Sequence, residues 1–446
     1  MSSTENVHHR MWRLRVAVVG AGAAGLCAAR HILSRPDIYA SPVVYELSKN
    51  VGGTWFYEER VGRYDNGIPI HSSMYRNLRT NLPKEVMMFP DFPFDPQLPS
   101  FLPHKEVHRY LQSYCETHSI TPHIKFTTVV EDVSPVATET EESSAGTRWT
   151  VTSRDGSGEE TTEAFDSVFI CNGHYSDPHF PSIPGMEHFK GTVMHSHSYR
   201  YPEPFSGKSV VVLGAGNSGV DICQELARSD AKVILSHGKP TLPTLSSVGV
   251  EQVPPMVRVL EDGSFQFQDG SVTKAQALML CTGYNFTYPF LNPTKLGLKI
   301  QEQLVTPLYK FMMPPAFPSL FILGICKIIC PFPHFHCQVQ YALGVLEGSV
   351  PLPSRADMEA DAQREIDRKA EMGVQLRHML RMEKDQWGYY QSLAHTGKFS
   401  PPPPVTQSLF NEVVKQRQIH PHNYRRLNYR LVSATQWEQM ETQTSL

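Results

Sequence analysis

Residues 14–46 decide the fold, and they read LRVAVVGAGAAGLCAARHILSRPDIYASPVVYE. Leu14 to Val19 is a short apolar run typical of a buried strand, and Ala23 to Leu33 has the length and composition of a helix. A second apolar run, Val43 to Glu46, follows the helix. Strand, glycine turn, helix and strand in this order predict a βαβ unit with two parallel strands.

The turn of this unit carries the chemistry. Glycines at these spacings allow a tight turn and let backbone N–H groups approach a pyrophosphate at the helix N-terminus. Glu46, at the end of the second strand, can accept hydrogen bonds from a ribose diol. The pattern therefore predicts a dinucleotide site formed by Glu46 and by Gly20, Ala21, Gly22, Ala23, Ala24 and Gly25.

The same construction returns at residues 209–236. An apolar run over 209–213 leads into GAGNSG at 214–219, a helix expected over 220–227 and a strand over 232–235. The glycine turn predicts a second dinucleotide site. Its candidate binding residues are Gly214, Gly216, Asn217, Ser218 and Gly219.

The second unit has no counterpart of Glu46. Its last strand runs into Ser236, His237 and Lys239, with no carboxylate among them. A carboxylate would repel a 2′-phosphate, whereas these three side chains can donate to one, which favours NADPH over NADH. The alternative, a solvated turn that is basic by chance, stays open.

Two further apolar runs bracket the second unit. Residues 167–171 end at Asn172-Gly173, and residues 277–281 end at Thr282-Gly283. We therefore expect an α/β protein with two Rossmann-like dinucleotide-binding domains, the second inserted into the first. The predicted limits are 1–184 and 301–446 for the two parts of the larger domain and 185–300 for the smaller one.

Less regular segments are also predicted. Residues 137–164 look like a surface β-meander. From about 355 onward the chain is charged and helical, with one helix expected over Ala356 to Arg381. It then becomes Pro-rich at 401–404 and is expected to end in a polar tail.

Composition excludes several classes of protein. The 446 residues carry a formal net charge of -3 and 40% hydrophobic residues, so no basic face for nucleic acid is expected. The eight cysteines are scattered and read as reduced core residues. Neither a signal peptide nor a membrane anchor is indicated, which favours a cytoplasmic protein, and a homodimer is the base-rate expectation.

Other candidate residues are ambiguous by themselves. Gly52-Gly53-Thr54-Trp55 fits a loop beside a flavin, with Gly53, Thr54 and Trp55 as contacts, or a plain turn with a core tryptophan. Asn81 alone is typical of a turn or a cap. His195, in the run from Phe189 to Tyr199, is read as structural. His334 and His336 lie two residues apart, but no third ligand is near in sequence, so no metal is expected.

Taken together, these motifs resemble the flavin-containing monooxygenases. The resemblance covers roughly residues 14–350, and the chain looks similar to the shorter branch that includes plant glucosinolate S-oxygenases and insect alkaloid N-oxygenases. It rests on GAGAAG with Glu46, on GGTW, on the run from Phe189 to Tyr199, on GAGNSG and on Cys281-Thr282-Gly283-Tyr284, in that order.

The resemblance implies cofactors and a mechanism. NADPH reduces FAD, reduced flavin captures O2 as a C4a-hydroperoxide, and bound NADP+ shields this species until a soft amine or sulfide attacks its distal oxygen. Asn81 matches the family's active-site asparagine, and Thr80 and Leu82 flank it. The same comparison adds Val130, Thr282 and Gly283 to the cofactor-binding residues. The substrate pocket is expected over the flavin, lined partly by residues 332–345.

Three alternatives share these motifs. A Baeyer–Villiger monooxygenase is second, because that signature closes with Trp where this chain has Tyr199. An NADPH oxidase that releases H2O2 differs only in how long the oxygenated flavin survives. An NADPH-sensing scaffold without turnover is the alternative that is not an enzyme. A disulfide reductase is disfavoured, since the chain lacks the required cysteine pair.

Overall fold

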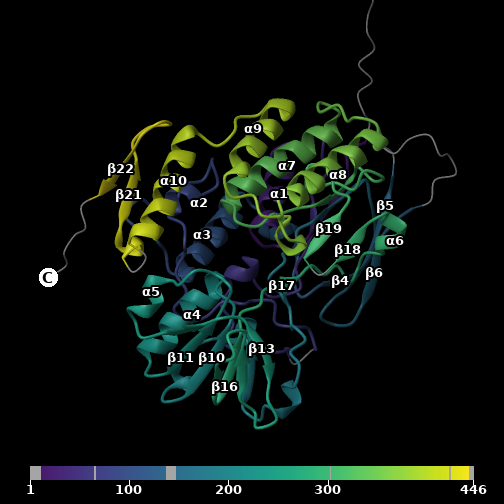
Figure 1. Cartoon of the computed structure of the whole chain (residues 1–446). Coiled ribbons are helices and arrows are strands. Elements are labelled where there is room, and N and C mark those ends of the chain that lie inside the picture. The colour runs from purple at the N-terminus through teal and green to yellow at the C-terminus, as the bar shows by residue number, and fades with distance from the viewer. Residues whose placement is uncertain (1–11, 65–66, 137–146, 302, 421–422, 441–446) are drawn as a thin grey trace, which may run out of the picture.

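A computed structural model describes residues 12–64, 67–136, 147–301, 303–420 and 423–440 (Figure 1). Its first sheet has the strand order β20-β7-β1-β2-β3, and every neighbouring pair is parallel. All four residues of β1 are buried, as in a strand covered on both faces. The strands are β1 (Val16–Val19), β2 (Val43–Tyr45), β3 (Ile124–Lys125), β7 (Ser167–Ile170) and β20 (Leu320–Ile322).

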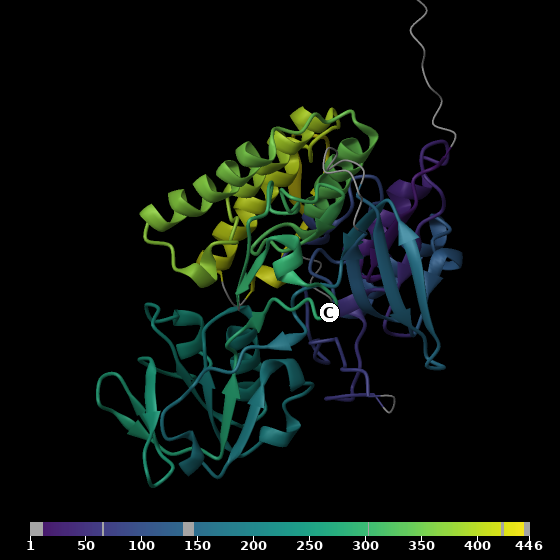
Figure 2. The ribbon, with the colours of Figure 1, turned by 90° about the vertical axis from the view of Figure 1, so that its right-hand side faces the viewer.

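The second sheet repeats this plan with the order β12-β11-β10-β16-β9, again parallel throughout. Figure 2 shows these teal and green elements as a lobe of their own below the helices of the larger lobe. Its elements are β9 (Thr192–His195), β10 (Ser209–Leu213), α4 (Asn217–Arg228), β11 (Lys232–Ser236), α5 (Pro243–Ser246), β12 (Glu251–Val253) and β16 (Ala277–Leu280). The protein is thus α/β with two dinucleotide-binding domains.

The chain crosses between the lobes twice, and the crossings pair with each other. On the way out it forms β8 (Asp177–Pro178), and on the way back β17 (Tyr284–Asn285), which is antiparallel to β8. The outgoing strand β8 lies shortly before the predicted start of the inserted domain at 185, whereas the returning strand β17 lies before its predicted end at 300. We keep the limits 1–184, 185–300 and 301–446 as a proposal.

Helices cover the first sheet. α1 (Ala23–Leu33) packs between α3 (His104–Thr117) and α7 (Pro331–Glu347), and α7 packs in turn on α9 (Asp385–Gly397). The predicted meander is β4 (Val129–Pro135), β5 (Trp149–Arg154) and β6 (Glu160–Phe165), although residues 137–146 lie outside the described part. Further elements are η1 (Gly53–Trp55), α2 (Lys84–Met87), β13 (Met256–Val259), β14 (Phe265–Phe267), β15 (Val272–Thr273), α6 (Pro293–Leu296), β18 (Lys299–Gln301) and β19 (Leu304–Thr306).

The C-terminal region corrects two expectations. The charged helix α8 (Arg355–Glu371) ends ten residues before Arg381, because Gly373 turns the chain with a φ of 74°. The expected polar tail is wrong over its described residues, which form α10 (Pro404–Ile419), the short helix η8 (Tyr424–Arg426) and the hairpin β21 (Asn428–Leu431) and β22 (Trp437–Met440). Four buried residues of α10 pack into the core, namely Val405, Leu409, Phe410 and Val413.

Among the described helices, none combines the length and the apolar character needed to cross a bilayer.

Candidate active site

The first glycine of each dinucleotide loop has the same strained environment. Gly20 has a φ of +105° and Gly214 a φ of +107°, a region that disfavours any side chain. A Cβ on Gly20 would lie 2.5 Å from the carbonyl oxygen of Cys171, and one on Gly214 would lie 2.6 Å from that of Cys281. Both positions require glycine because the backbone of each loop packs closely against the end of a neighbouring strand.

The last glycine of each loop is equally constrained. A Cβ on Gly25 would lie 1.8 Å from the carbonyl oxygen of Gly20, and one on Gly219 would lie 1.9 Å from that of Gly214. The missing side chains let α1 and α4 begin directly against the strands that precede them. The two loops are therefore copies in geometry as well as in sequence.

The middle glycines leave room for a ligand. A Cβ on Gly216 would meet nothing within 4 Å, while the nearest atom to one on Gly22 is the Cα of Gly53, 3.6 Å away. Neither α1 nor α4 has a side-chain N-cap or an acidic residue in its first turn. Their first N–H groups and positive helix ends therefore fit the pyrophosphates of FAD and NADPH.

Glu46 closes the first loop. Its carboxylate accepts hydrogen bonds from the backbone N–H groups of Ala21 and Ser48, both at 2.8 Å. Burial raises the pKa of Glu46, although these hydrogen bonds lower it. Each carboxylate oxygen keeps a second lone pair for a ribose hydroxyl, so the observed geometry is compatible with the predicted role.

The loop that carries Gly53, Thr54 and Trp55 lies directly against the first site. The backbone N–H of Gly52 donates to the carbonyl of Ala21 at 2.9 Å. A Cβ on Gly53 would approach the Cα of Gly22 to 3.1 Å. Ala23 and Ala24 continue the first turn of α1 beside this contact. The structure thus brings the two N-terminal glycine motifs together.

The turn after β11 requires a correction. Ser236 is fully buried, and its hydroxyl donates to the Pro254 carbonyl and accepts from the Met256 N–H, so it is not oriented toward a ligand. His237 has both ring nitrogens bonded, to Gln252 and to the N–H of Lys239. These internal partners leave Lys239 as the principal candidate for the 2′-phosphate.

Lys239 reaches back to the second glycine loop. Its Nζ donates to the carbonyl of Ala215 at 2.6 Å. Burial lowers the pKa of Lys239, and the charge of Arg381, from the larger lobe, lowers it further. Sequence reasoning missed Arg381, which is 142 positions away in the chain and lies in no recognisable motif.

Asn81 follows a rigidly held residue. The N–H of Thr80 donates to the Leu102 carbonyl at 2.8 Å, and the N–H of Leu102 donates to the Thr80 hydroxyl at 2.9 Å. The next residue, Leu82, is 8% exposed and belongs to the core. The Asn81 side chain itself bonds to no other residue in the described part of the chain, so its amide can serve a ligand.

Thr282 and Gly283 lie at the return crossing. The Thr282 hydroxyl donates to the His179 carbonyl at 2.5 Å, and the Gly283 carbonyl accepts from the His195 ring at 3.0 Å. These bonds give His195 the structural role expected of it. Val130 is buried in β4 in the cluster that includes Val19 and Tyr45 near the end of the first sheet, and its contact with a cofactor stays a prediction.

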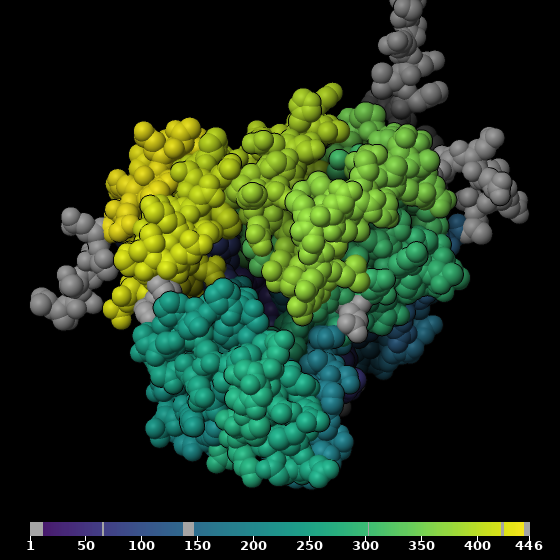
Figure 3. All heavy atoms as spheres, viewed as in Figure 1, coloured from purple at the N-terminus to yellow at the C-terminus, as the bar shows by residue number. Residues whose placement is uncertain are grey.

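Asn217 and Ser218 open α4 beside Gly216, at the edge of the second loop. Figure 3 shows the surface hollowed along the junction between this lobe and the larger one, with N-terminal residues in purple at its base. This hollow separates the two lobes that carry the predicted nucleotide sites.

The two histidines of α7, His334 and His336, have different surroundings. His336 lies beside Cys27 and His31 of α1, with ligand atoms within 4.8 Å of one another, so two further candidate ligands that are distant in sequence lie near His336 in space. Arg30 donates to His31 at 2.9 Å, and the rings of His31 and His336 share a hydrogen bond of 3.2 Å. These contacts form a hydrogen-bond chain in the core, in which the charge of Arg30 opposes a cation.

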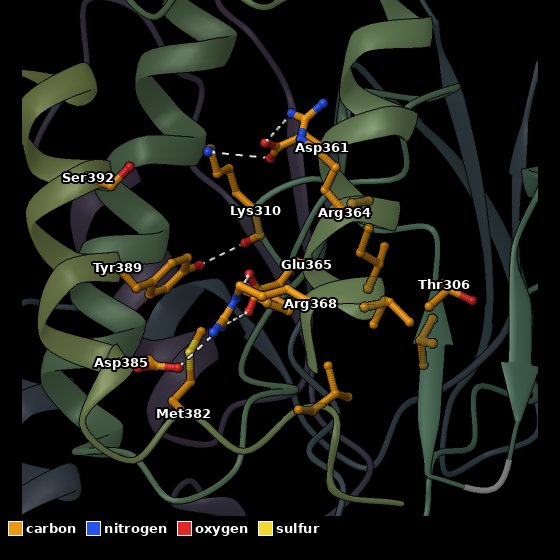
Figure 4. A pocket seen from close by; sticks show the side chains of 16 residues that line it. Thr306, Lys310, Asp361, Arg364, Glu365, Arg368, Met382, Asp385, Tyr389 and Ser392 are labelled. Carbon is orange, nitrogen blue, oxygen red and sulfur yellow. Dashed lines mark hydrogen bonds and ion pairs between the residues drawn. The ribbon is translucent and has the colours of Figure 1, made fainter. Parts of the chain in front are cut away.

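One cavity lies away from the nucleotide loops. Its volume is about 400 Å³, and it opens between α8, α9 and β19 (Figure 4). The charged groups at its rim pair with one another, Lys310 with Asp361 and Arg368 with both Glu365 and Asp385. None of the predicted cofactor residues lines it, so it lies apart from the predicted nucleotide sites.

Comparison with known proteins identifies the family. The chain matches the flavin-binding monooxygenase-like family model over residues 13–241 and 238–443. It is 36% identical over 433 residues to flavin-containing monooxygenase FMO GS-OX-like 4 of Arabidopsis thaliana, covering 92% of this chain and 93% of that protein.

Solved structures agree. The S-allyl-L-cysteine S-oxygenase of Allium sativum has a TM-score of 0.82 at 33% identity, with 93% of this chain and 95% of that one covered. Tmm of a Pelagibacter strain has a TM-score of 0.81 at 27% identity, with 97% of each chain covered. The protein belongs to the flavin-binding monooxygenase family, whose members bind FAD and depend on NADPH.

Proposed function

We propose that this protein transfers one atom of O2 to a nucleophilic nitrogen or sulfur of a small substrate. The balance is NADPH, H+, O2 and substrate in, and NADP+, water and the N- or S-oxide out. The similarity to an S-oxygenase at 33% identity supports sulfur as the first atom to test. The observation that carries the proposal is the amide of Asn81, which has no hydrogen-bond partner among the described residues and lies on a segment that contacts both lobes.

That segment runs from Ser72 to Asn81. The Ser72 hydroxyl donates to the Thr54 carbonyl of the first site at 3.0 Å. The Tyr75 hydroxyl donates to Asp221 on α4, the helix that opens from the second site, at 3.2 Å. Asn81 is therefore carried by a strip of chain that spans the gap between the two nucleotide sites.

The protein's own tasks follow from these positions. Bound FAD would supply the redox chemistry that activates O2 with electrons from NADPH. The N–H groups of α1 and α4 would hold the pyrophosphates, Glu46 the adenosine ribose of FAD and Lys239 the 2′-phosphate of NADPH. The Asn81 amide orients the reacting groups by hydrogen bonding, and the buried walls keep water out.

The test is an assay of purified holoenzyme with a panel of thioethers and tertiary amines. NADPH consumption, H2O2 and oxygenated product are measured together. We expect the amount of product to equal the amount of NADPH consumed minus the amount of H2O2 released. Consumption that ends entirely as H2O2 with every compound would contradict the proposal and favour an oxidase, and esters formed from ketones would favour Baeyer–Villiger chemistry.

Asn81→Ala tests the observation itself. We expect bound flavin to be retained and product formation to fall by roughly two orders of magnitude, comparable to the loss of one oriented hydrogen-bond donor in other enzymes. Asn411→Ala, on the exposed side of α10, is the matched control. Unchanged oxygenation in Asn81→Ala would remove Asn81 from the mechanism.

A further inference from the structure

The C-terminal helix η8 places one guanidinium between the two lobes. Arg425 Nε donates to the carbonyl of Thr80 at 3.1 Å. Its Nη1 and Nη2 donate to the two carboxylate oxygens of Asp221, at 3.2 Å and 2.8 Å. Both side chains are mostly buried, with 24% and 21% of their surface exposed. All three nitrogens of Arg425 are therefore engaged, in opposite directions.

The contact with Thr80 bears directly on Asn81. The Thr80 carbonyl belongs to the peptide plane whose nitrogen is that of Asn81, so a bond to this oxygen fixes the orientation of that plane. The other polar groups of Thr80 are already held by Leu102. The hydrogen bond from Arg425 thus comes from the C-terminal region, and it fixes the orientation of the peptide between Thr80 and Asn81.

The contact with Asp221 bears on the second nucleotide site. Asp221 lies one turn into α4, four positions after Asn217, where the glycine loop becomes helix. Its carboxylate also accepts from Tyr75 at 3.2 Å. A second arginine of the same region, Arg417, donates to the Asn217 side chain at 3.3 Å. Figure 1 shows the end of α10 directly above α4 and α5.

We propose that Arg425 is a positioning residue that fixes the Asn81 peptide plane and the start of α4 in one arrangement, so that the asparagine and the bound nicotinamide nucleotide meet correctly. This proposal rests on the role proposed for Asn81. A guanidinium suits the task because its planar fork grips a carboxylate with two N–H groups and still presents Nε–H. A lysine ammonium cannot reproduce this geometry.

The test uses Arg425→Gln, Arg425→Lys and Asp221→Asn in the full-length holoenzyme. We expect Arg425→Gln and Asp221→Asn each to raise KM for NADPH by roughly tenfold, the effect of losing a charged hydrogen bond. The share of NADPH that ends as H2O2 should rise in both, and the flavin absorbance change on adding NADP+ should weaken. Arg425→Lys should not restore these values.

The effects of changing Arg425 and Asp221 should not be additive. The double variant is expected to be no worse than the more severe single variant, because either change removes the same contact. Arg430→Gln is the matched control, since Arg430 lies on the adjoining strand β21 and forms an exposed pair with Glu438. It should leave KM, the H2O2 share and the spectral change as in the unmodified protein.

Normal KM for NADPH and a normal spectral change in both Arg425→Gln and Asp221→Asn would overturn the proposal, even if their melting temperatures fell. If Arg425→Gln does not fold, Asp221→Asn decides, because it breaks the same contact from α4. The spectral change and KM need no oxygenated product. A protein that oxygenates nothing would therefore refute the proposed function and leave the result for Arg425 standing.

Discussion

Lys239 illustrates how much depends on the environment of a single residue. Three polar side chains lie at or next to the turn after β11. Ser236 is buried in the core, and His237 is hydrogen-bonded to Gln252. Lys239 alone extends to the second glycine loop, where burial lowers the pKa of its ammonium group. A phosphate beside it would compensate the buried charge.

We therefore predict that Lys239→Ala raises KM for NADPH roughly tenfold while KM for NADH changes little, since only NADPH carries the 2′-phosphate. Steady-state kinetics with both nucleotides measure this ratio. His237→Ala is the control, expected to affect both nucleotides alike. Equal losses for NADPH and NADH in Lys239→Ala would rule out the phosphate contact.

His334 is a buried histidine on α7. It is 0% exposed, stacks on Tyr389 at 5.4 Å, and neither ring nitrogen has a hydrogen-bond partner among the described residues. Burial lowers the pKa of His334 to about 3. Because the unfolded chain takes up the proton first, this group lowers the free energy of unfolding as pH falls from about 6.5 toward 3.

His334→Phe should accordingly raise the free energy of unfolding by about 1 kcal/mol at neutral pH, by removing unsatisfied polar atoms. The substitution should also make the free energy of unfolding fall less steeply as the pH is lowered from about 6.5 to 4. Urea unfolding across this range measures both effects, with the exposed His420→Phe as control. An unchanged slope in His334→Phe would contradict the account.

At the scale of elements, α10 shows where sequence patterns lose information. Its buried residues, Val405, Leu409 and Val413, recur every four positions, which is a helical face. Polar residues between them and four prolines at 401–404 make the segment look like a tail. A short amphipathic helix is hard to see when its partners are distant in sequence.

We predict that Leu409→Ala lowers the free energy of unfolding by about 2–5 kcal/mol, the cost of a cavity at a fully buried leucine. Val414→Ala, in the same helix but 37% exposed, should cost about 0.5 kcal/mol or less. Chemical denaturation compares the two. Equal effects would mean that α10 does not pack as described.

Local patterns predicted the first βαβ unit closely, because a tight glycine turn forces strand and helix together within 33 residues. The expected helix over Ala23 to Leu33 is observed with the same limits, whereas α4 begins three residues before Val220, within the glycine loop itself. Arg425 could not be found in this way, since its partners Thr80 and Asp221 lie 345 and 204 positions away.

At the scale of the whole molecule, the two glycine loops have similar geometry, and we propose that each binds a different nucleotide. We predict that Gly25→Ala lowers the flavin content, measured as visible absorbance per protein, because its Cβ would displace the first loop. Gly219→Ala should keep flavin and raise KM for NADPH by about tenfold or more.

Gly388→Ala, on α9 with nothing within 4 Å of its Cβ, is the matched control and should change neither property. If Gly25→Ala affected the nicotinamide nucleotide and Gly219→Ala affected flavin, the assignment of the two loops would be reversed.

The paired crossings have a mechanical consequence. Because β8 and β17 are hydrogen-bonded to each other, and the Gly283 carbonyl accepts from the His179 N–H at 2.9 Å, the two covalent links form one double ribbon. Two linking segments without hydrogen bonds between them would allow the lobes to slide and to rotate relative to each other. Because the two links are bonded to each other, they restrain the relative movement of the lobes more than two separate links would.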